Sequence, residues 1–156
     1  MTEVQTAGAA KVPPDRIVGR DGRAKAYRPL PVEARRAAIE SGLAAYDRGD
    51  FFEAHEALEP AWMGSSDPAE RALLQGLIKV AAAYVHDVRG NPAGIRTNLT
   101  GARRLLAEAA EEPAENAAGI DLDALLADVD ARLADLDAHP AEPTLAAPVL
   151  RRKVTR

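Results

Sequence analysis

The stretch LLQGLIKVAAAYV, Leu73 to Val85, is the longest apolar pattern of the chain. Its apolar side chains do not alternate with polar ones, and on a helix they cover nearly the whole circumference. A helix of this kind must be covered on several sides, so the stretch predicts the central helix of an all-α protein. Gly76 and the alanines Ala81, Ala82 and Ala83 leave room for neighbouring helices to approach closely.

Turn signals on both sides of this stretch define the helix and its neighbours. Asp67-Pro68 supplies an N-cap and a proline at the first helical position, Gly90 is a stop signal, and Asn91-Pro92 starts the next helix. Apolar spacing then predicts five helices, with these ranges: Val32 to about Arg48, Asp50 to Trp62 or Met63, Pro68 to about Arg89, Pro92 to about Glu111, and Asp121 to about Leu136. Their short connections predict a compact five-helix bundle with mostly antiparallel neighbours.

The composition narrows the class of protein. A length of 156 residues suits one domain with tails, and the absence of cysteine excludes disulfides, thiolate metal sites and thiol nucleophiles. No apolar run is long enough to span a bilayer, and the first residues lack the order of a signal peptide. We therefore expect a cytoplasmic protein with no membrane partner.

Basic residues gather at the two ends of the chain, while the middle is acidic. Residues 1–29 are expected to form a basic arm, flexible or loosely docked, and residues 139–156 a Pro-containing basic tail; residues 30–138 form the helical bundle domain. The last predicted helix is an acidic landing face for a basic tail, since Arg132 stands against a set of aspartates: Asp121, Asp123, Asp128, Asp130, Asp135 and Asp137. Nucleic acid is disfavoured as a partner because no aromatic residues interleave the basic ones.

The stretch FFEAHEALEPAW, Phe51 to Trp62, combines an apolar face with polar groups. Asp50 and Glu53 form a variant capping box before it, and Pro60 is expected to bend or end the helix. Successive residues turn by about 100° in a helix, which puts His55 inside the apolar arc and Glu59 one turn on, at its border. A buried histidine whose ring nitrogens lack partners costs ~1–3 kcal/mol, so His55 needs partners.

The central helix offers such partners on one stripe, which carries Gln75, Lys79, Ala82 and His86. If this stripe faces the preceding helix, then His55, Glu59 and His86 would converge as ligands of one divalent transition metal: zinc, manganese, nickel or iron. An open position on the metal would permit hydrolytic chemistry, with Glu56 or Asp87 as the catalytic carboxylate. Supporting positions are expected at Trp62, Gln75, Tyr84 and Asn91.

The same polar residues have an alternative interpretation. They would form a structural hydrogen-bond pin in a non-enzymatic interaction module, which self-associates as a homodimer through an alanine-rich helix face or binds another partner. The pattern HEALE is not the HExxH of a zincin, and the Glu-x-x-His pair of di-iron bundles is also missing, so those two enzyme classes are disfavoured. The residues do not decide between enzyme and module, and they name no substrate.

Three motifs occur in the chain in this order: FFEAHEALEPAW, LLQGLIKVAAAYVH and RGNPAGIRTNLTGARRLL. In these motifs the chain resembles the family known as domain of unknown function 309. This family consists of small all-helical prokaryotic proteins, and the resemblance covers about Tyr46 to Ala107. It implies a compact helical bundle but no activity. The family's polar positions fall on His55, Glu56, Glu59, Trp62, Gln75, His86, Gly90 and Asn91. The chain departs from the pattern at Pro60 and at Met63. Family members commonly have a basic residue at the position of Met63, and a basic residue could help to bind an anion. The resemblance therefore does not imply an anion site in this chain.

Overall fold

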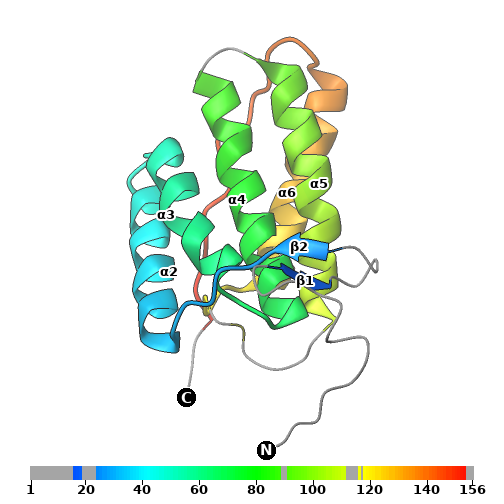
Figure 1. Cartoon of the computed structure of the whole chain (residues 1–156). Helices are drawn as coiled ribbons and strands as arrows, with labels where there is room; N and C mark the ends of the chain where they lie inside the picture. Colours follow the sequence, from blue (N-terminus) through cyan, green and yellow to red (C-terminus); the bar gives the residue numbers. More distant parts are fainter. Residues whose placement is uncertain (1–15, 19–23, 89–90, 112–115, 117, 154–156) are drawn as a thin grey trace, which may run out of the picture.

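The computed structural model describes residues 16–18, 24–88, 91–111, 116 and 118–153; for the strands and for residues 86–88 it describes the backbone alone. Within these ranges the chain is an all-α bundle, which confirms the predicted fold class (Figure 1). Its helices are α2 (Val32–Asp47), α3 (Phe51–Met63), α4 (Pro68–Val88), α5 (Pro92–Ala110) and α6 (Leu122–Ala138). None of these helices is both long and apolar enough to cross a membrane.

Four of the five helices start at a capping side chain, as predicted, while α2 follows Pro31 without a side-chain cap. Asp50 accepts a hydrogen bond from the Glu53 amide at 3.3 Å, and Asp67 accepts one from the Glu70 amide at 2.8 Å. At the start of α5, the side chain of Asn91 accepts a hydrogen bond from the Gly94 amide at 3.2 Å. At the start of α6, the side chain of Asp121 accepts one from the Ala124 amide at 3.1 Å. Each cap satisfies an amide that has no partner inside its helix, and this local chemistry explains why the boundaries could be predicted.

Pro60 does not end α3, which continues to Met63. A proline in a helix removes one backbone hydrogen bond and crowds the preceding turn. Here the last turn is closed by the amide of Gly64, which donates to the carbonyl of Pro60 at 2.9 Å. The helix end therefore falls at the glycine rather than at the proline.

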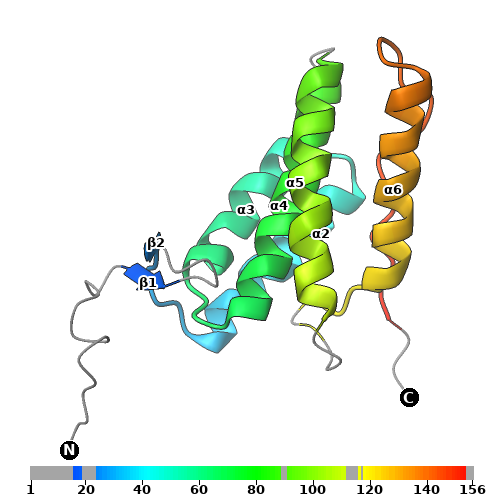
Figure 2. The same ribbon diagram turned by 90° about the vertical axis from the view of Figure 1, so that its right-hand side faces the viewer.

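Consecutive helices pack side by side along the chain, and α4 lies between α3 and α5. The core consists mainly of leucine and alanine, with Leu74, Leu99 and Leu106 fully buried. The largest interface joins α4 to α5, and α6 packs against α5. Figure 2 shows α6 on the side of the bundle opposite to α3.

A short two-stranded antiparallel sheet, which no sequence pattern predicts, precedes the helices. Strand β1 (Arg16–Val18) pairs with β2 (Ala24–Ala26), with Ile17 opposite Lys25. The chain then runs along the end of α3, where the Arg28 amide donates to the Met63 carbonyl at 2.8 Å. Three-residue strands are too short to show an alternating pattern. The first fifteen residues of the predicted basic arm lie outside the described residues.

The C-terminal residues 143–153, which we call the strap, cross the bundle between α2 and α6 (Figures 1 and 2). On the α2 side, the hydroxyl of Tyr46 donates to the carbonyl of Pro148 at 2.6 Å, and Arg152 pairs with Asp47 at 2.9 Å. On the α6 side, Arg151 pairs with Asp128 at 2.9 Å. The basic end of the chain thus contacts the acidic last helix, the landing face proposed for it, and also reaches α2.

Candidate functional site

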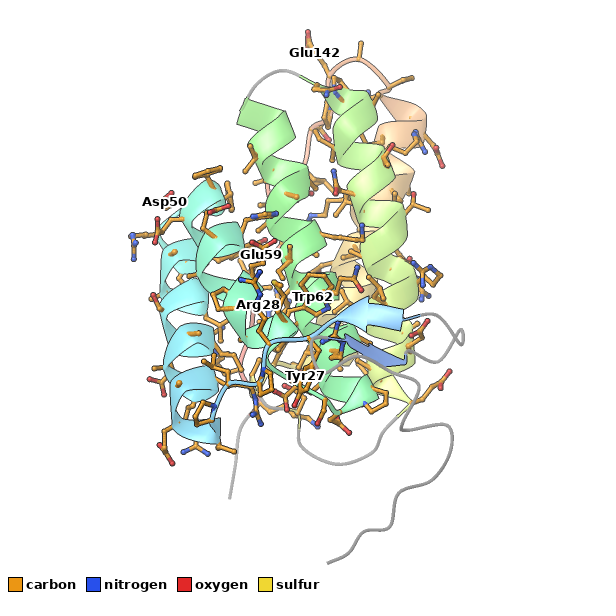
Figure 3. All side chains as sticks on the ribbon, in the orientation of Figure 1. Tyr27, Arg28, Asp50, Glu59, Trp62 and Glu142 are labelled. Atoms are coloured by element: carbon orange, nitrogen blue, oxygen red, sulfur yellow. The ribbon has the colours of Figure 1, made fainter. Side chains whose placement is uncertain are left out.

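Helix α3 presents His55 and Glu59 on one face, one turn apart. Its buried residues are Ala54, Leu58 and Ala61, and His55 lies beside them with its side chain 30% exposed. Glu59 is also half-buried. Both residues therefore have the partial burial that helical spacing predicts for them. Figure 3 shows Glu59 and Trp62 of α3 close to Arg28. The backbone amide of Arg28 donates a hydrogen bond to the carbonyl of Met63, the last residue of this helix.

Contacts at both ends of α3 give its register against α4. The rings of Phe51 and Tyr84 lie 5.9 Å apart, and the guanidinium of Arg71 lies 5.2 Å from the centre of the Trp62 ring. The two helices are therefore antiparallel. In this register Lys79 of α4 lies level with His55.

The hydrogen bond of His55 is local to α3. Its Nδ1 lies 3.3 Å from Oε2 of Glu56, the next residue. Helical spacing predicts Glu59 as the partner of a ring nitrogen. Within the described residues, however, the Glu59 carboxylate has no hydrogen bond or ion pair, and Nε2 of His55 has none either. An interhelical hydrogen bond from His55, which the pin interpretation requires, is not found among the described residues.

This bond fixes which ring nitrogen of His55 is available. An ionised carboxylate can only accept hydrogen bonds, so Nδ1 carries the hydrogen when the imidazole is neutral. The lone pair is then on Nε2. A carboxylate behind a histidine is the arrangement that orients metal-binding histidines in many proteins. Glu56 is half-exposed, with 51% of its side chain accessible, so it adjusts easily to this role.

His86 and Asp87 lie in the last turn of α4, but their side chains are outside the described residues. In the register given above, the backbone of His86 lies two helical turns beyond Lys79, near the start of α3. Among the side chains that are described, no three His, Asp or Glu residues are close enough together to hold a metal ion. The ligand set His55, Glu59 and His86 therefore stays a prediction.

The four supporting residues divide between two sides of α4. Gln75 lies on the stripe of Lys79, whereas Tyr84 is nine residues further on, half a circle away, and is only 3% exposed. Trp62 is half-buried on α3, next to the Arg28 segment. Asn91 caps α5. Tyr84 contacts Phe51, which precedes His55 by one turn on α3, whereas Asn91 lies at the start of α5.

Arg71 is a functional candidate that the sequence analysis missed. It is 7% exposed, and its guanidinium donates to the carbonyls of Trp62 and Ser65, both at 3.0 Å. Burial lowers the pKa of Arg71, because it removes water from the charged form. Arg71 fixes the α3–α4 turn and the Trp62 ring next to it. The available signal was an arginine next to the apolar run of the central helix.

Fold and site together define a small all-helical bundle in which His55 and Glu59 lie half-buried on one face of α3, next to the central helix α4. Residues 39–105 match the family described as Domain of unknown function (DUF309), and this confirms the resemblance. The matched segment begins within α2, earlier than the Tyr46 expected from the motifs, and ends within α5. No curated protein and no solved structure matches the chain.

Proposed function

We propose that the protein binds one divalent transition metal on the face of α3, through Nε2 of His55 and the carboxylate of Glu59. The backbone of His86 lies about two helical turns beyond the level of His55 on α4, so the proposal rests on the two ligands of α3. The supporting observation is the hydrogen bond between His55 and Glu56, which in the neutral imidazole leaves the lone pair on Nε2. Within the part of the chain that the structure describes, Nε2 and the carboxylate of Glu59, one turn away, have no hydrogen-bond partner. A metal at this place would break no hydrogen bond that these residues make there.

The enzymatic form of this proposal is metal-assisted hydrolysis. A metal with an open coordination position activates water near neutral pH. The chain's own contribution is to orient His55 through Glu56 and to offer the Glu56 carboxylate as a proton acceptor. We propose the cytoplasm as its location, since a chain without cysteine needs no oxidising compartment.

The test is elemental analysis of untagged protein together with its melting temperature. We expect near one metal per chain in the wild type and a gain in melting temperature on adding zinc, manganese, nickel or iron. Replacing His55 or Glu59 by alanine should remove both effects, whereas Glu56→Gln should weaken metal binding by about 10–100-fold.

The control is His139→Ala, which removes an exposed histidine of the tail and should leave metal binding unchanged. A wild-type protein that holds no metal and gains no stability with any of the four ions would refute the proposal. Equal metal content in His139→Ala and His55→Ala would also refute it, because binding would then not involve His55.

The alternative function is a non-enzymatic interaction module, and one exposed aromatic residue favours it. Phe52 at the start of α3 is 59% exposed, unlike the buried apolar residues of the core. A homodimer formed through this surface should dissociate in Phe52→Asp. Light scattering of both proteins at the same concentration checks this, and a monomeric mass for the wild type would exclude the homodimer.

A further inference from the structure

A cavity of about 380 Å³ lies beneath the strap. Tyr46, Phe51 and Tyr84 form one wall, and strap residues 146–150 form the other. Tyr84 lies half a helical turn from Gln75, so this cavity and Gln75 are on different sides of α4.

Aromatic residues are concentrated at this cavity. The chain has three tyrosines, two phenylalanines and one tryptophan. Two of the tyrosines and one phenylalanine line the cavity. The Tyr46 and Phe51 rings meet edge to face at 5.1 Å, and Phe51 and Tyr84 lie 5.9 Å apart with tilted planes. In a core that is otherwise mostly leucine and alanine, this is a continuous aromatic wall.

The strap wall is held by its own buried residues. Pro148 and Leu150 are almost fully buried, while Val149 between them is 62% exposed. The Tyr46 hydroxyl donates to the Pro148 carbonyl at 2.6 Å, which ties the strap to the aromatic wall. The strap is therefore anchored at the cavity without filling it.

The cavity offers no free charge to a ligand. Asp47 at its edge is paired with Arg152 at 2.9 Å. Burial raises the pKa of Tyr46 far above its usual range, so this phenol stays neutral at physiological pH. A charged ligand would lose its hydration here without gaining a partner.

We propose that this cavity binds a neutral, planar aromatic molecule between the aromatic wall and the strap. Pockets for small molecules commonly measure about 300–1,000 Å³ and are mainly apolar, and this cavity lies at the lower end of that range. Offset or edge-to-face contacts with the three rings hold a planar molecule, and the burial of its apolar surface provides the affinity.

The test uses N-phenyl-1-naphthylamine, a neutral aromatic probe whose fluorescence rises in apolar surroundings. The wild-type protein should give a saturable increase with one site per chain. Ala147→Trp places an indole in the cavity and should weaken binding at least tenfold. The matched control is Ala141→Trp, at an exposed position of the same C-terminal segment outside the cavity, and it should bind the probe as the wild type does.

Ala146→Trp is the second blocking variant, for use if Ala147→Trp fails to fold, since Ala146 is exposed and also lines the cavity. It too should weaken binding at least tenfold. No saturable fluorescence increase in the wild type would overturn the proposal. Equal affinity in the blocking variants and in Ala141→Trp would overturn it as well, because the probe would then bind elsewhere.

Discussion

Deleting residues 143–156 should lower the free energy of unfolding by about 3–5 kcal/mol. The deletion exposes the surface under Leu150 and Pro148, and burying a side chain such as Leu150 contributes about 1.5–3 kcal/mol. It also leaves the Tyr46 hydroxyl without the Pro148 carbonyl, and a buried hydroxyl without a partner costs about 1–3 kcal/mol. Because domains are typically stable by about 5–15 kcal/mol, this is a large loss.

Urea unfolding of the full and shortened chains measures this difference, and a pair of point variants identifies its source. Leu150 is 4% exposed and its neighbour Val149 is 62% exposed. Leu150→Ala should cost about 2–3 kcal/mol, whereas Val149→Ala should change stability by less than about 0.5 kcal/mol. If the two substitutions cost the same, the strap is not packed on the bundle.

The ion pairs of the strap should contribute less than its apolar contacts. Arg151–Asp128 and Arg152–Asp47 are at the surface, where such pairs contribute about 0–1 kcal/mol. Deleting only residues 151–156 should therefore cost less than deleting the whole strap. The deletion also removes two backbone hydrogen bonds, from the Asp121 amide to the Arg151 carbonyl at 2.9 Å and from the Lys153 amide to the Gly119 carbonyl at 2.8 Å. High salt should remove only the part of the cost that comes from the ion pairs, since salt screens exposed charges.

The N-terminal end of the strap should respond to acid. The hydroxyl of Thr144 donates to Asp135 at 2.6 Å, and this bond, with the amides of Thr144 and Leu145, lowers the pKa of Asp135. A carboxyl whose pKa is lower in the folded protein stabilises it above the unfolded value, about 3.9. That stabilisation is lost as the pH falls through the lower, folded pKa. The stability difference between the full and shortened chains should shrink in that range.

The helices could be predicted from the sequence because their signals are local. Asp67 and Pro68 mark the start of α4 within two residues, and Asn91 and Pro92 do the same for α5. The position of His55 next to buried residues also follows from helical period alone. The strap could not be predicted in this way: its contact with Tyr46 joins residues 102 positions apart, and an extended segment has no period that identifies its partner.

The candidate site was only partly predictable for a similar reason. The sequence places Glu56 and Glu59 near His55, but the choice between them depends on side-chain rotamers, and in the structure His55 contacts Glu56. The register of α3 against α4 rests on contacts such as Phe51 with Tyr84, which no spacing in the sequence shows. The role of Arg71 could not be predicted, because it binds backbone carbonyl groups. Every residue has such a group, so the sequence does not show which ones an arginine contacts.

Gly76→Leu should destabilise the protein by about 3 kcal/mol, because Gly76 is the point of closest approach between α4 and α5. A Cβ at this position would lie 2.7 Å from Cδ2 and 2.8 Å from Cγ of Leu106. Leu106 is fully buried and cannot turn away from the added side chain. Leucine forms helices better than glycine by about 0.8 kcal/mol, so any loss must come from packing.

Gly101 provides the matched control on the facing helix. A Cβ there would meet the Lys79 side chain, with Cδ at 3.0 Å, and this flexible, half-buried chain is able to move away. Gly101→Leu should therefore change the free energy of unfolding by less than about 1 kcal/mol. Similar losses at both glycines would mean that the α4–α5 interface is not closest at Gly76.

A double variant tests whether the loss at Gly76 arises from Leu106 itself. Leu106→Ala alone should cost about 2–5 kcal/mol, because it leaves a cavity in the interface. Combined with Gly76→Leu, the new side chain occupies that cavity, and the double variant should be more stable than the sum of the single losses by at least about 1 kcal/mol. Additive losses in urea unfolding would contradict direct contact between the new side chain and Leu106, and with it the close packing of α4 on α5 at Gly76.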